Sequence, residues 1–190
     1  MLVLASSSTY RQTLLSRLGV PFTSTSPDLD ETPHPGESPM ALVRRLSEQK
    51  ARVVASRYPD ALIIGSDQVS VRDGEVIGKP HTHERAVAQL RASSGRRIDF
   101  LTGLCLLNTA TDTAHVMVEP FSVVFRQLSE DAIERYLRAD EPYDCAGSFK
   151  LEGQGITLFS SLSGRDPNAL IGLPLIALVD LLQREGVAVP

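Results

Sequence analysis

The first nineteen residues, MLVLASSSTYRQTLLSRLG, place a short apolar run directly before three serines and a helix. Residues 2–5 are typical of a buried strand, and we expect this strand to form an edge of the sheet. Ser8 predicts the N-cap of a helix over residues 9–18, and Gly19 can end that helix in the left-handed conformation. A strand that stops at a helix N-terminus directs unpaired N–H groups and a partial positive charge at one point. That arrangement suits a phosphate.

Strand and helix patterns alternate along the rest of the chain and predict an α/β fold, with helices around a largely antiparallel sheet. ALIIGSD is typical of a buried strand that ends in the carboxylate of Asp67, and Asp73–Gly74 then predicts a tight hairpin. Ser38 followed by Pro39 predicts a helix start. We expect helices at 39–57, 83–92, 130–138 and 173–184, and strands at 98–108 and 114–125. This order does not follow the strict βαβ alternation of a dinucleotide-binding domain.

Composition limits the classes of protein to which the chain can belong. Its 190 residues fit one domain over 1–190, and a formal net charge of −4 gives no indication of the broad basic face that duplex nucleic acid requires. No apolar run approaches the roughly 18 residues that span a bilayer, and the first run is too short for a signal peptide. We therefore expect a soluble, cytoplasmic protein with no membrane or nucleic-acid partner. Cys105 and Cys145 have neither CxxC nor zinc spacing and are expected to stay reduced.

Two carboxylates are candidates for a metal site. Mg²⁺ is usually held by one or two carboxylates, with substrate phosphates completing its shell. Asp67 follows LIIGS, where an acid is an unusual choice for a core strand. Glu31 lies in the proline-rich loop SPDLDETPHPGESP, and by pattern alone a solvated loop acid is the more frequent interpretation.

The lysines are few in a chain rich in arginine. Of 19 basic residues, only Lys50, Lys79 and Lys150 are lysine, which indicates positions that need a compact ammonium, although chance is an alternative, above all for Lys150. GEVIGKP resembles a P-loop. It has too few residues between Gly74 and Gly78, and Pro80 stands where Ser or Thr should bind magnesium, so we reject a P-loop.

Two further segments have more than one interpretation. His81 and His83 flank a helix start, but without a third nearby ligand they are expected to be surface residues rather than a metal pair. EPYDCAGSFKLEGQGI is either a loop and strand or the wall of a ligand pocket into which Glu152 projects.

A series of short motifs resembles the Maf family of nucleoside triphosphate pyrophosphatases over essentially the whole chain. The motifs are LASSSTYRQTLL, DETP, EQKA, GSDQV, GKP, LTG, YDCAGSF and GLPL, in the order and spacing of that family. Within the family, the YceF-like branch, which is associated with 7-methyl-GTP hydrolysis, is most similar in the motifs DETP, IIGSDQV, CAGSFK, EGQGITLF and GRDPNALIGLPLIAL. The resemblance implies a Maf/inosine-triphosphatase-like mixed sheet flanked by helices, with two lobes around a central cleft.

The resemblance also implies a reaction and a set of site residues. Water attacks the α-phosphate of a nucleoside triphosphate and releases the monophosphate and pyrophosphate, with help from a divalent cation such as Mg²⁺ or Mn²⁺. Ser6 and Arg11 are implied to contact the triphosphate, and Lys50 and Lys79 match the family's basic positions near the phosphates. Glu31 and Asp67 are implied to hold the metal or activate water, with the base role assigned to Asp67.

Substrate choice is implied to depend on Tyr10, Gln68 and Glu152. An aromatic face can stack on the cationic 7-methylguanine ring, and a carboxylate can accept a hydrogen bond from its N–H edge. A sister branch that acts on dTTP and UTP typically has arginine, threonine and glutamine at these positions, and that activity is one alternative. A non-catalytic, nucleotide-binding regulator of cell division is another. A homodimer is the usual expectation for a soluble assembly.

Overall fold

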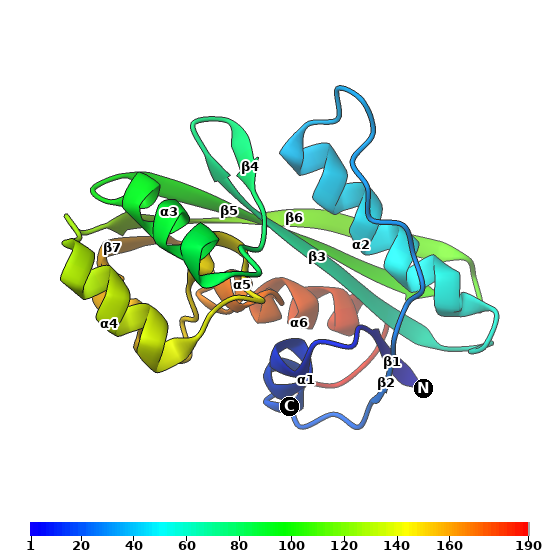
Figure 1. The fold of residues 1–190 in the computed structure, drawn as a ribbon. Coiled ribbons are helices and arrows are strands. Elements are labelled where there is room, and N and C mark those ends of the chain that lie inside the picture. The colour runs from blue at the N-terminus through cyan, green and yellow to red at the C-terminus, as the bar shows by residue number, and fades with distance from the viewer. Residues whose placement is uncertain (190) are drawn as a thin grey trace. The chain divides into compact units, whose positions relative to one another are not determined.

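The computed structural model describes residues 1–189 and has a mixed α/β fold (Figure 1). Its strands are β1 (Leu2–Ala5), β2 (Thr23–Thr25), β3 (Leu62–Arg72), β4 (Glu75–Ile77), β5 (Arg97–Asn108), β6 (Thr113–Phe125) and β7 (Phe159–Gly164). Its helices are α1 (Thr9–Ser16), α2 (Pro39–Ala55), α3 (His83–Ser93), α4 (Glu130–Asp140), α5 (Asn168–Ile171) and α6 (Leu175–Arg184), with 3₁₀ helices η1 (Ala146–Ser148) and η2 (Gln154–Leu158). Over residues 1–189, no helix is both long enough and apolar enough to cross a bilayer.

The strands form one seven-stranded mixed sheet in the order β2-β1-β3-β5-β6-β7, with β4 paired to β3. β1 runs parallel to both β2 and β3, and Leu4 lies opposite Ile64 in the β1–β3 register. β4 is antiparallel to β3, and β7 is antiparallel to β6. The mixed sheet flanked by helices is confirmed. The prediction that β1 is an edge strand is wrong, because the three-residue β2, which gave no sequence signal, covers its outer side.

Contacts between residues divide the chain into two compact units. Unit 1 contains 1–68, 101–119 and 166–190, whereas unit 2 contains 69–100 and 120–165. β3, β5 and β6 contribute residues to both units. The single domain and the central cleft stay predictions.

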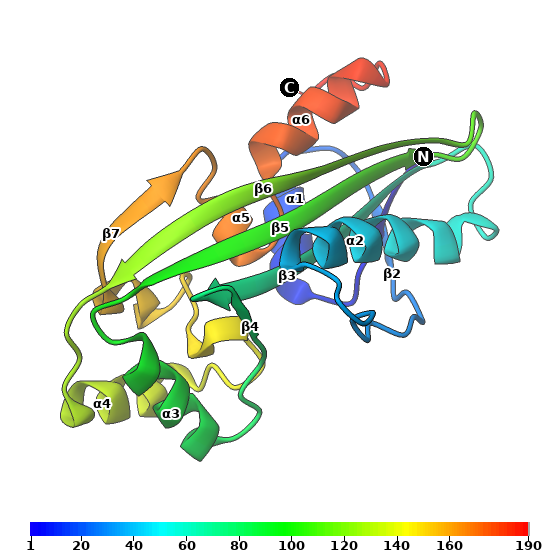
Figure 2. The ribbon, with the colours of Figure 1, turned by 90° about the horizontal axis from the view of Figure 1, so that it is seen from above.

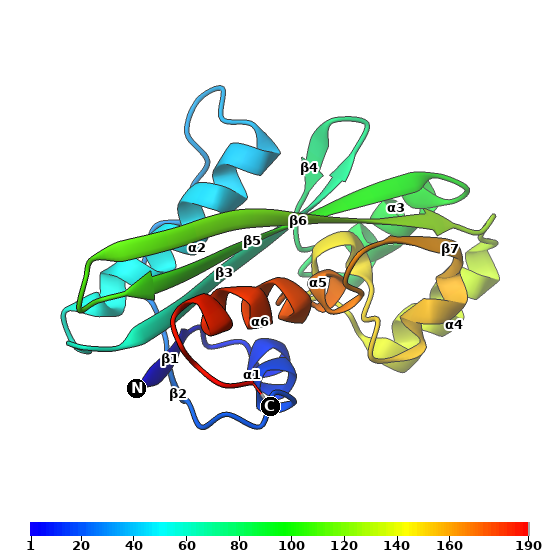
Figure 3. The same ribbon diagram turned by 180° about the vertical axis from the view of Figure 1, so that it is seen from behind.

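In unit 1, helices cover both faces of the sheet. Leu4 and Ile64 pack in a core with residues of α1 and α6, whereas Val3 and Ile63 pack in a second core with residues of α2. Figures 2 and 3 show α2 on one face of these strands and α1 with α6 on the other. The alternation follows from the period of two in a strand.

Two glycines let α2 approach the sheet closely. A Cβ added at Gly65 of β3 would lie 2.0 Å from the backbone oxygen of Ser47, and one added at Gly103 of β5 would lie 2.2 Å from that of Val43. Both glycines are therefore required for the contact between α2 and the sheet, and this contact sets the height of α2 above β3.

Unit 2 contains α3 and α4, which contact one another, and a cluster of aromatic residues. Phe149 makes edge-to-face contacts with Phe100, Phe125 and Phe159, at ring-centroid distances of 5.3, 6.2 and 4.9 Å. Such geometry is favoured by the quadrupoles of the rings. Phe149 lies in the segment between η1 and η2, so the cluster fixes this irregular segment from inside the unit.

Several local predictions are confirmed and two are corrected. Ser8 and Ser38 are the N-caps of α1 and α2, and Asp73 and Gly74 form the hairpin turn with φ of 51° and 87°. Asp67 does not end its strand, because β3 continues to Arg72. The strand predicted within 141–156 is also wrong: this segment forms turns and 3₁₀ helices, and β7 begins only at Phe159.

Candidate functional site

A buried lysine joins two carboxylates in unit 1. Lys50 Nζ lies 2.6 Å from Asp67 Oδ1 and 2.9 Å from Glu31 Oε1. The side chains of Lys50 and Asp67 are only 7% and 9% exposed, whereas that of Glu31 is 55% exposed. Burial of an isolated charge is costly, so the ammonium and the carboxylate of Asp67 stabilise one another. Glu31, in contrast, can exchange this partner for a ligand.

The fold explains why Lys50 and Asp67 meet. Lys50 lies on the buried face of α2, among residues that pack on the sheet. Asp67 lies two residues after Gly65 on β3 and thus faces the same side of the strand. Because α2 comes close to β3 at Gly65, the Lys50 side chain reaches Asp67 directly.

Arg11 adds a second positive charge to this site. Two carboxylates and one ammonium leave one net negative charge, and both Asp67 and Glu31 interact electrostatically with Arg11. Burial lowers the pKa of Arg11, and the two carboxylates oppose that shift. The Arg11 Nε–H donates to the Gly172 carbonyl at 2.8 Å, and the Ser66 hydroxyl donates to the same oxygen at 2.9 Å. The guanidinium is therefore held at a fixed place, where it interacts electrostatically with the two carboxylates.

The serine turn between β1 and α1 is closed by its own hydrogen bonds. Ser6 is buried, and its Oγ accepts from the backbone N–H of Ser8 at 3.1 Å. Ser8 Oγ in turn accepts from the backbone N–H of Arg11 at 3.4 Å. Ser24 of β2 donates to the Ser6 carbonyl at 2.7 Å, so β2 supports the turn. Tyr10 is half-buried on the first turn of α1.

Gln68 faces away from Asp67, on the side of β3 that α6 covers. Its amide N–H groups donate to Thr102 Oγ1 at 3.0 Å and to the carbonyls of Ala169 and Leu170 at 2.6 and 3.2 Å. These bonds attach β3 to β5 and α5. The structure thus gives Gln68 a supporting role, and its role in base choice stays a prediction.

Lys79 and Glu152 belong to unit 2, and both are exposed. Lys79 lies two residues after the end of β4. The segment that carries Glu152 is tied to α4, because the Tyr136 hydroxyl accepts from the Lys150 backbone N–H at 2.9 Å and Asp140 Oδ2 accepts from that of Gln154 at 2.7 Å. Lys150 Nζ donates to the Asp140 carbonyl at 3.0 Å, so this lysine stabilises the end of α4.

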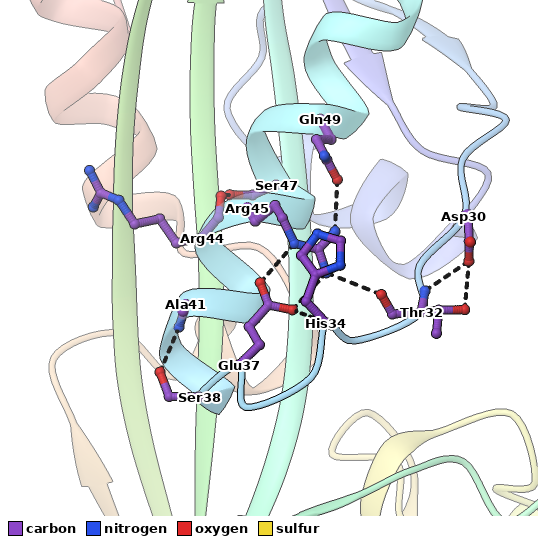
Figure 4. A network of polar contacts seen from close by, with 10 residues as sticks. All are labelled: Asp30, Thr32, His34, Glu37, Ser38, Ala41, Arg44, Arg45, Ser47 and Gln49. Carbon is purple, nitrogen blue, oxygen red and sulfur yellow. Dashed lines mark hydrogen bonds and ion pairs between the residues drawn. The ribbon is translucent and has the colours of Figure 1, made fainter.

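The segment that carries Glu31 is held to α2 by a polar network that sequence reasoning missed (Figure 4). Arg45 Nε and Nη2 each lie 2.7 Å from one oxygen of the Glu37 carboxylate. This pairing lowers the pKa of Glu37 to about 2. The only sequence signal was the spacing of eight residues between an acid before the helix and an arginine inside it. That spacing is too common to identify a contact.

Acid should weaken the contribution of this pair to stability. The pKa of Glu37 is lowered from 4.5 to about 2, so its contribution is complete above pH 4.5 and is lost as the pH falls toward 2. We expect the difference in urea midpoint between wild type and Glu37→Gln to shrink across that window. Glu75→Gln, at an exposed position on β4, is the control and should show no such trend. A difference for Glu37→Gln that stays constant with pH would contradict this account.

The polar side chains give little support for a metal site whose ligands all come from the protein. Within residues 1–189, no group of three or more His, Cys, Asp or Glu side chains could hold a metal ion. His83 contacts Tyr143 Oη at 2.9 Å and Glu134 at 3.2 Å, and His81 is exposed. Cys105 and Cys145 are both free, and burial raises the pKa of each thiol to about 12. Neither cysteine is therefore suited to act as a thiolate nucleophile at neutral pH.

The GRDPNALIGLPL segment also contributes structure that residue patterns alone did not assign. Asp166 is fully buried and accepts hydrogen bonds from the backbone N–H groups of Asn168 and Ile176, both at 2.8 Å. It thus joins α5 to the start of α6. Gly172 follows with φ of 119°, which lets its carbonyl accept from both Arg11 and Ser66.

Known proteins resemble this chain in both sequence and fold. A protein named 7-methyl-GTP pyrophosphatase from Pseudomonas syringae pv. tomato is 59% identical over 189 residues, covering 100% of this chain and 98% of that protein. The protein of the same name from Nitrosococcus oceani is 59% identical over 97% of this chain and 93% of its own length. That from Pseudomonas aeruginosa is 58% identical over 100% of this chain and 98% of its own length.

Two solved structures share the fold at low sequence identity. The Staphylococcus aureus Ham1 protein has a TM-score of 0.57 at 15% identity, covering 97% of this chain and 98% of that chain. A HAM1 protein from Coxiella burnetii has a TM-score of 0.56, also at 15% identity, over 96% of this chain and 98% of its own. The family model described as Maf-like protein matches residues 1–185. Together with the full-length relatives, this match shows that the chain belongs to the Maf family.

Proposed function

We propose that this Maf protein hydrolyses 7-methyl-GTP to 7-methyl-GMP and pyrophosphate, and so removes a noncanonical nucleotide before it reaches RNA. The observation that carries the proposal is the buried Lys50, bound to both Glu31 and Asp67, in a chain whose full-length relatives bear the name 7-methyl-GTP pyrophosphatase. Nucleotide pools are used in the cytoplasm, so we also propose that location.

The reaction requires charge balance and a positioned water more than covalent chemistry. In the proposed mechanism, Asp67 accepts a proton from the water whose oxygen attacks the α-phosphorus. Pyrophosphate leaves as the bond between the α-phosphorus and the oxygen that bridges to the β-phosphate breaks. Arg11 and Lys50 offset the negative charge that gathers on the phosphates. Ser6 orients the triphosphate from the serine turn, and Lys79 contacts its phosphates.

The donor set suits a hard divalent cation such as Mg²⁺ or Mn²⁺. Glu31 and Asp67 supply carboxylate oxygens, and such ions are commonly held by one or two carboxylates with the remaining ligands from water and phosphate. Glu31 is exposed enough to turn from Lys50 toward a ligand. When bound, the cation would polarise the phosphoryl oxygens.

We assign base selectivity to Tyr10, Gln68 and Glu152. The 7-methylguanine ring carries a positive charge, so the Tyr10 ring face and the Glu152 carboxylate would each attract it. The bonds from Gln68 to the α5 segment support a role in shaping the surroundings of the base.

Kinetics on a nucleotide panel test the proposed substrate. We expect kcat/KM for 7-methyl-GTP to exceed the values for GTP, dTTP and UTP, with either Mg²⁺ or Mn²⁺ present. A preference for dTTP or UTP would instead identify the activity of the sister branch. Nucleotide binding without hydrolysis under any metal condition would favour a regulatory binding protein.

Glu152→Gln should reduce discrimination between substrates more than it reduces turnover. Loss of the negative charge removes attraction to the cationic base, so the ratio of kcat/KM for 7-methyl-GTP to that for GTP should fall. The rate on GTP should change less. Glu75→Gln, an exposed carboxylate of unit 2, serves as the charge-matched control. An unchanged ratio in Glu152→Gln shows that Glu152 does not read the base.

A further inference from the structure

Two arginines of α2 form ion pairs with glutamates, but in different surroundings. Arg52 pairs with Glu48 on the same helix at 2.7 Å, with exposures of 43% and 37%. Arg45 pairs with Glu37, which lies before the helix, and these side chains are only 18% and 9% exposed. Arg52 also pairs with Asp112, between β5 and β6, at 2.9 Å, but the Asp112 side chain is 83% exposed. Arg45, in contrast, connects the helix to a separate segment through a pair that is largely buried.

Arg45 contacts residues 30–37, the segment that carries Glu31, near both of its ends. Its Nε and Nη2 donate to the two carboxylate oxygens of Glu37, and Nη2 also donates to the Thr32 carbonyl at 3.2 Å. Nη1 donates to Gln49 Oε1 at 2.9 Å, which fixes the guanidinium plane against α2 (Figure 4). A planar fork with this many donors can make such a set of contacts, and an ammonium cannot.

The rest of the segment is closed by short local bonds. Asp30 Oδ1 accepts from both the backbone N–H and the hydroxyl of Thr32, at 2.9 and 2.6 Å. Glu37 Oε2 accepts from the backbone N–H of His34 at 3.0 Å. Glu31 lies between Asp30 and Thr32, so its backbone is held on one side by the Asp30 turn and on the other by Arg45.

Glu31 needs such support because its own ion pair is weak. Its side chain is 55% exposed, and an ion pair with an exposed partner contributes little by itself. The Lys50–Glu31 distance of 2.9 Å therefore depends on where the backbone of the segment is held. Arg45 also interacts electrostatically with Asp67 of the site and with Asp30, which precedes Glu31.

We propose that Arg45 is a positioning residue: through Glu37 and the Thr32 carbonyl it fastens residues 30–37 to α2 and keeps Glu31 at the Lys50–Asp67 pair. This inference rests on the proposed function, because it assigns Arg45 to the same hydrolytic site. Arg45 touches neither the substrate nor the reacting atoms in this account. Its effect on the reaction passes through the position of Glu31.

The test compares Arg45→Ala, Glu37→Gln, the double variant and the matched control Arg52→Ala, all in the full chain. We expect kcat/KM for 7-methyl-GTP to fall by about 10- to 100-fold in Arg45→Ala, as is usual when support for a ligating side chain is removed. Most of the fall should be in kcat. Because the two residues act through one contact, the double variant should be no slower than Arg45→Ala alone. Arg52→Ala should retain wild-type kinetics.

Amide hydrogen exchange of the nucleotide-free protein provides a second readout. Arg45→Ala should speed exchange within residues 30–37 and leave β3 and β5 unchanged, whereas a purely structural role would speed exchange across α2 and the sheet as well. Arg45→Ala with wild-type kcat/KM, or with faster exchange throughout unit 1, overturns the inference.

The outcomes separate this inference from the proposed function. A wild-type protein that hydrolyses 7-methyl-GTP, beside an equally active Arg45→Ala, refutes only the role of Arg45. A wild-type protein that hydrolyses no nucleotide refutes the proposed function and with it the role of Arg45 in the reaction.

Discussion

Asp67→Asn is expected to lower kcat for 7-methyl-GTP by about 10²- to 10⁴-fold, the usual contribution of a positioned general base. The amide cannot accept a proton from water, and the substitution removes the carboxylate that lies 2.6 Å from Lys50 Nζ. Nucleotide binding should remain, because Arg11 and Lys50 keep their positive charge. Steady-state kinetics and a direct binding measurement on the same preparation separate the two effects.

Glu48→Gln is the control for Asp67→Asn. Glu48 is a half-buried carboxylate of α2 that pairs with Arg52 and lies outside the Lys50 cluster, so its loss should leave kcat unchanged. If Asp67→Asn turns over 7-methyl-GTP at the wild-type rate, Asp67 is not the base. If Asp67→Asn loses binding, hydrolysis and the folded signal together, Asp67→Glu is the second variant, because it keeps the negative charge. If Asp67→Glu is folded, its kcat reports the effect on catalysis separately from the effect on folding.

Gly65→Ala is expected to lower the free energy of unfolding by about 1–3 kcal/mol or more, because it overpacks the contact between α2 and β3. The new Cβ would lie 2.0 Å from the Ser47 backbone oxygen and 2.9 Å from the Ala51 backbone nitrogen. Both contacts are with backbone, so α2 itself must shift. Lys50 lies on this part of α2, and we therefore expect kcat/KM to fall as well. Urea unfolding gives the first quantity, and kinetics on the folded protein give the second.

Gly78→Ala provides the matched comparison for stability. Gly78 has nothing within 4 Å of an added Cβ, so its substitution should change the free energy of unfolding by no more than about 0.5 kcal/mol. Equal unfolding free energies for Gly65→Ala and wild type would show that α2 is not held by close contact at Gly65.

Local signals predicted most of the elements because their causes are local. A serine that accepts from its own helix explains the N-caps at Ser8 and Ser38, and two residues that tolerate positive φ explain the turn at Asp73–Gly74. Segments without such signals were missed. β2 has only three residues and forms because it pairs with the parallel strand β1. The backbone path of residues 141–156 depends on residues with positive φ and on the packing of Phe149 in the aromatic cluster.

The candidate site likewise combines residues that the sequence identifies with contacts that only the tertiary structure makes. The residue types and the resemblance identified Ser6, Arg11, Glu31, Lys50 and Asp67 as candidates. The ion pairs in which Lys50 joins Glu31 and Asp67 depend on the crossing of α2 over β3. The hydrogen bond that fixes Arg11 comes from Gly172, which is 161 positions away along the chain. The support that Arg45 gives to the Glu31 segment likewise had no distinctive pattern.

The sequence by itself determined most of the strands and helices, the N-caps at Ser8 and Ser38, the hairpin at Asp73–Gly74, and the residue types that the candidate site contains. These features follow from interactions between residues a few positions apart along the chain, so the local sequence is enough to produce them. Only the tertiary structure decided that β1 lies inside the sheet, that Asp67 lies within a continuous strand, and which cation each carboxylate meets. The position of β1 depends on its pairing with β2, whereas the meeting of Lys50 with Asp67 depends on how closely α2 can approach β3 at Gly65. That distance is set by packing across the fold, and no pattern along the chain encodes it.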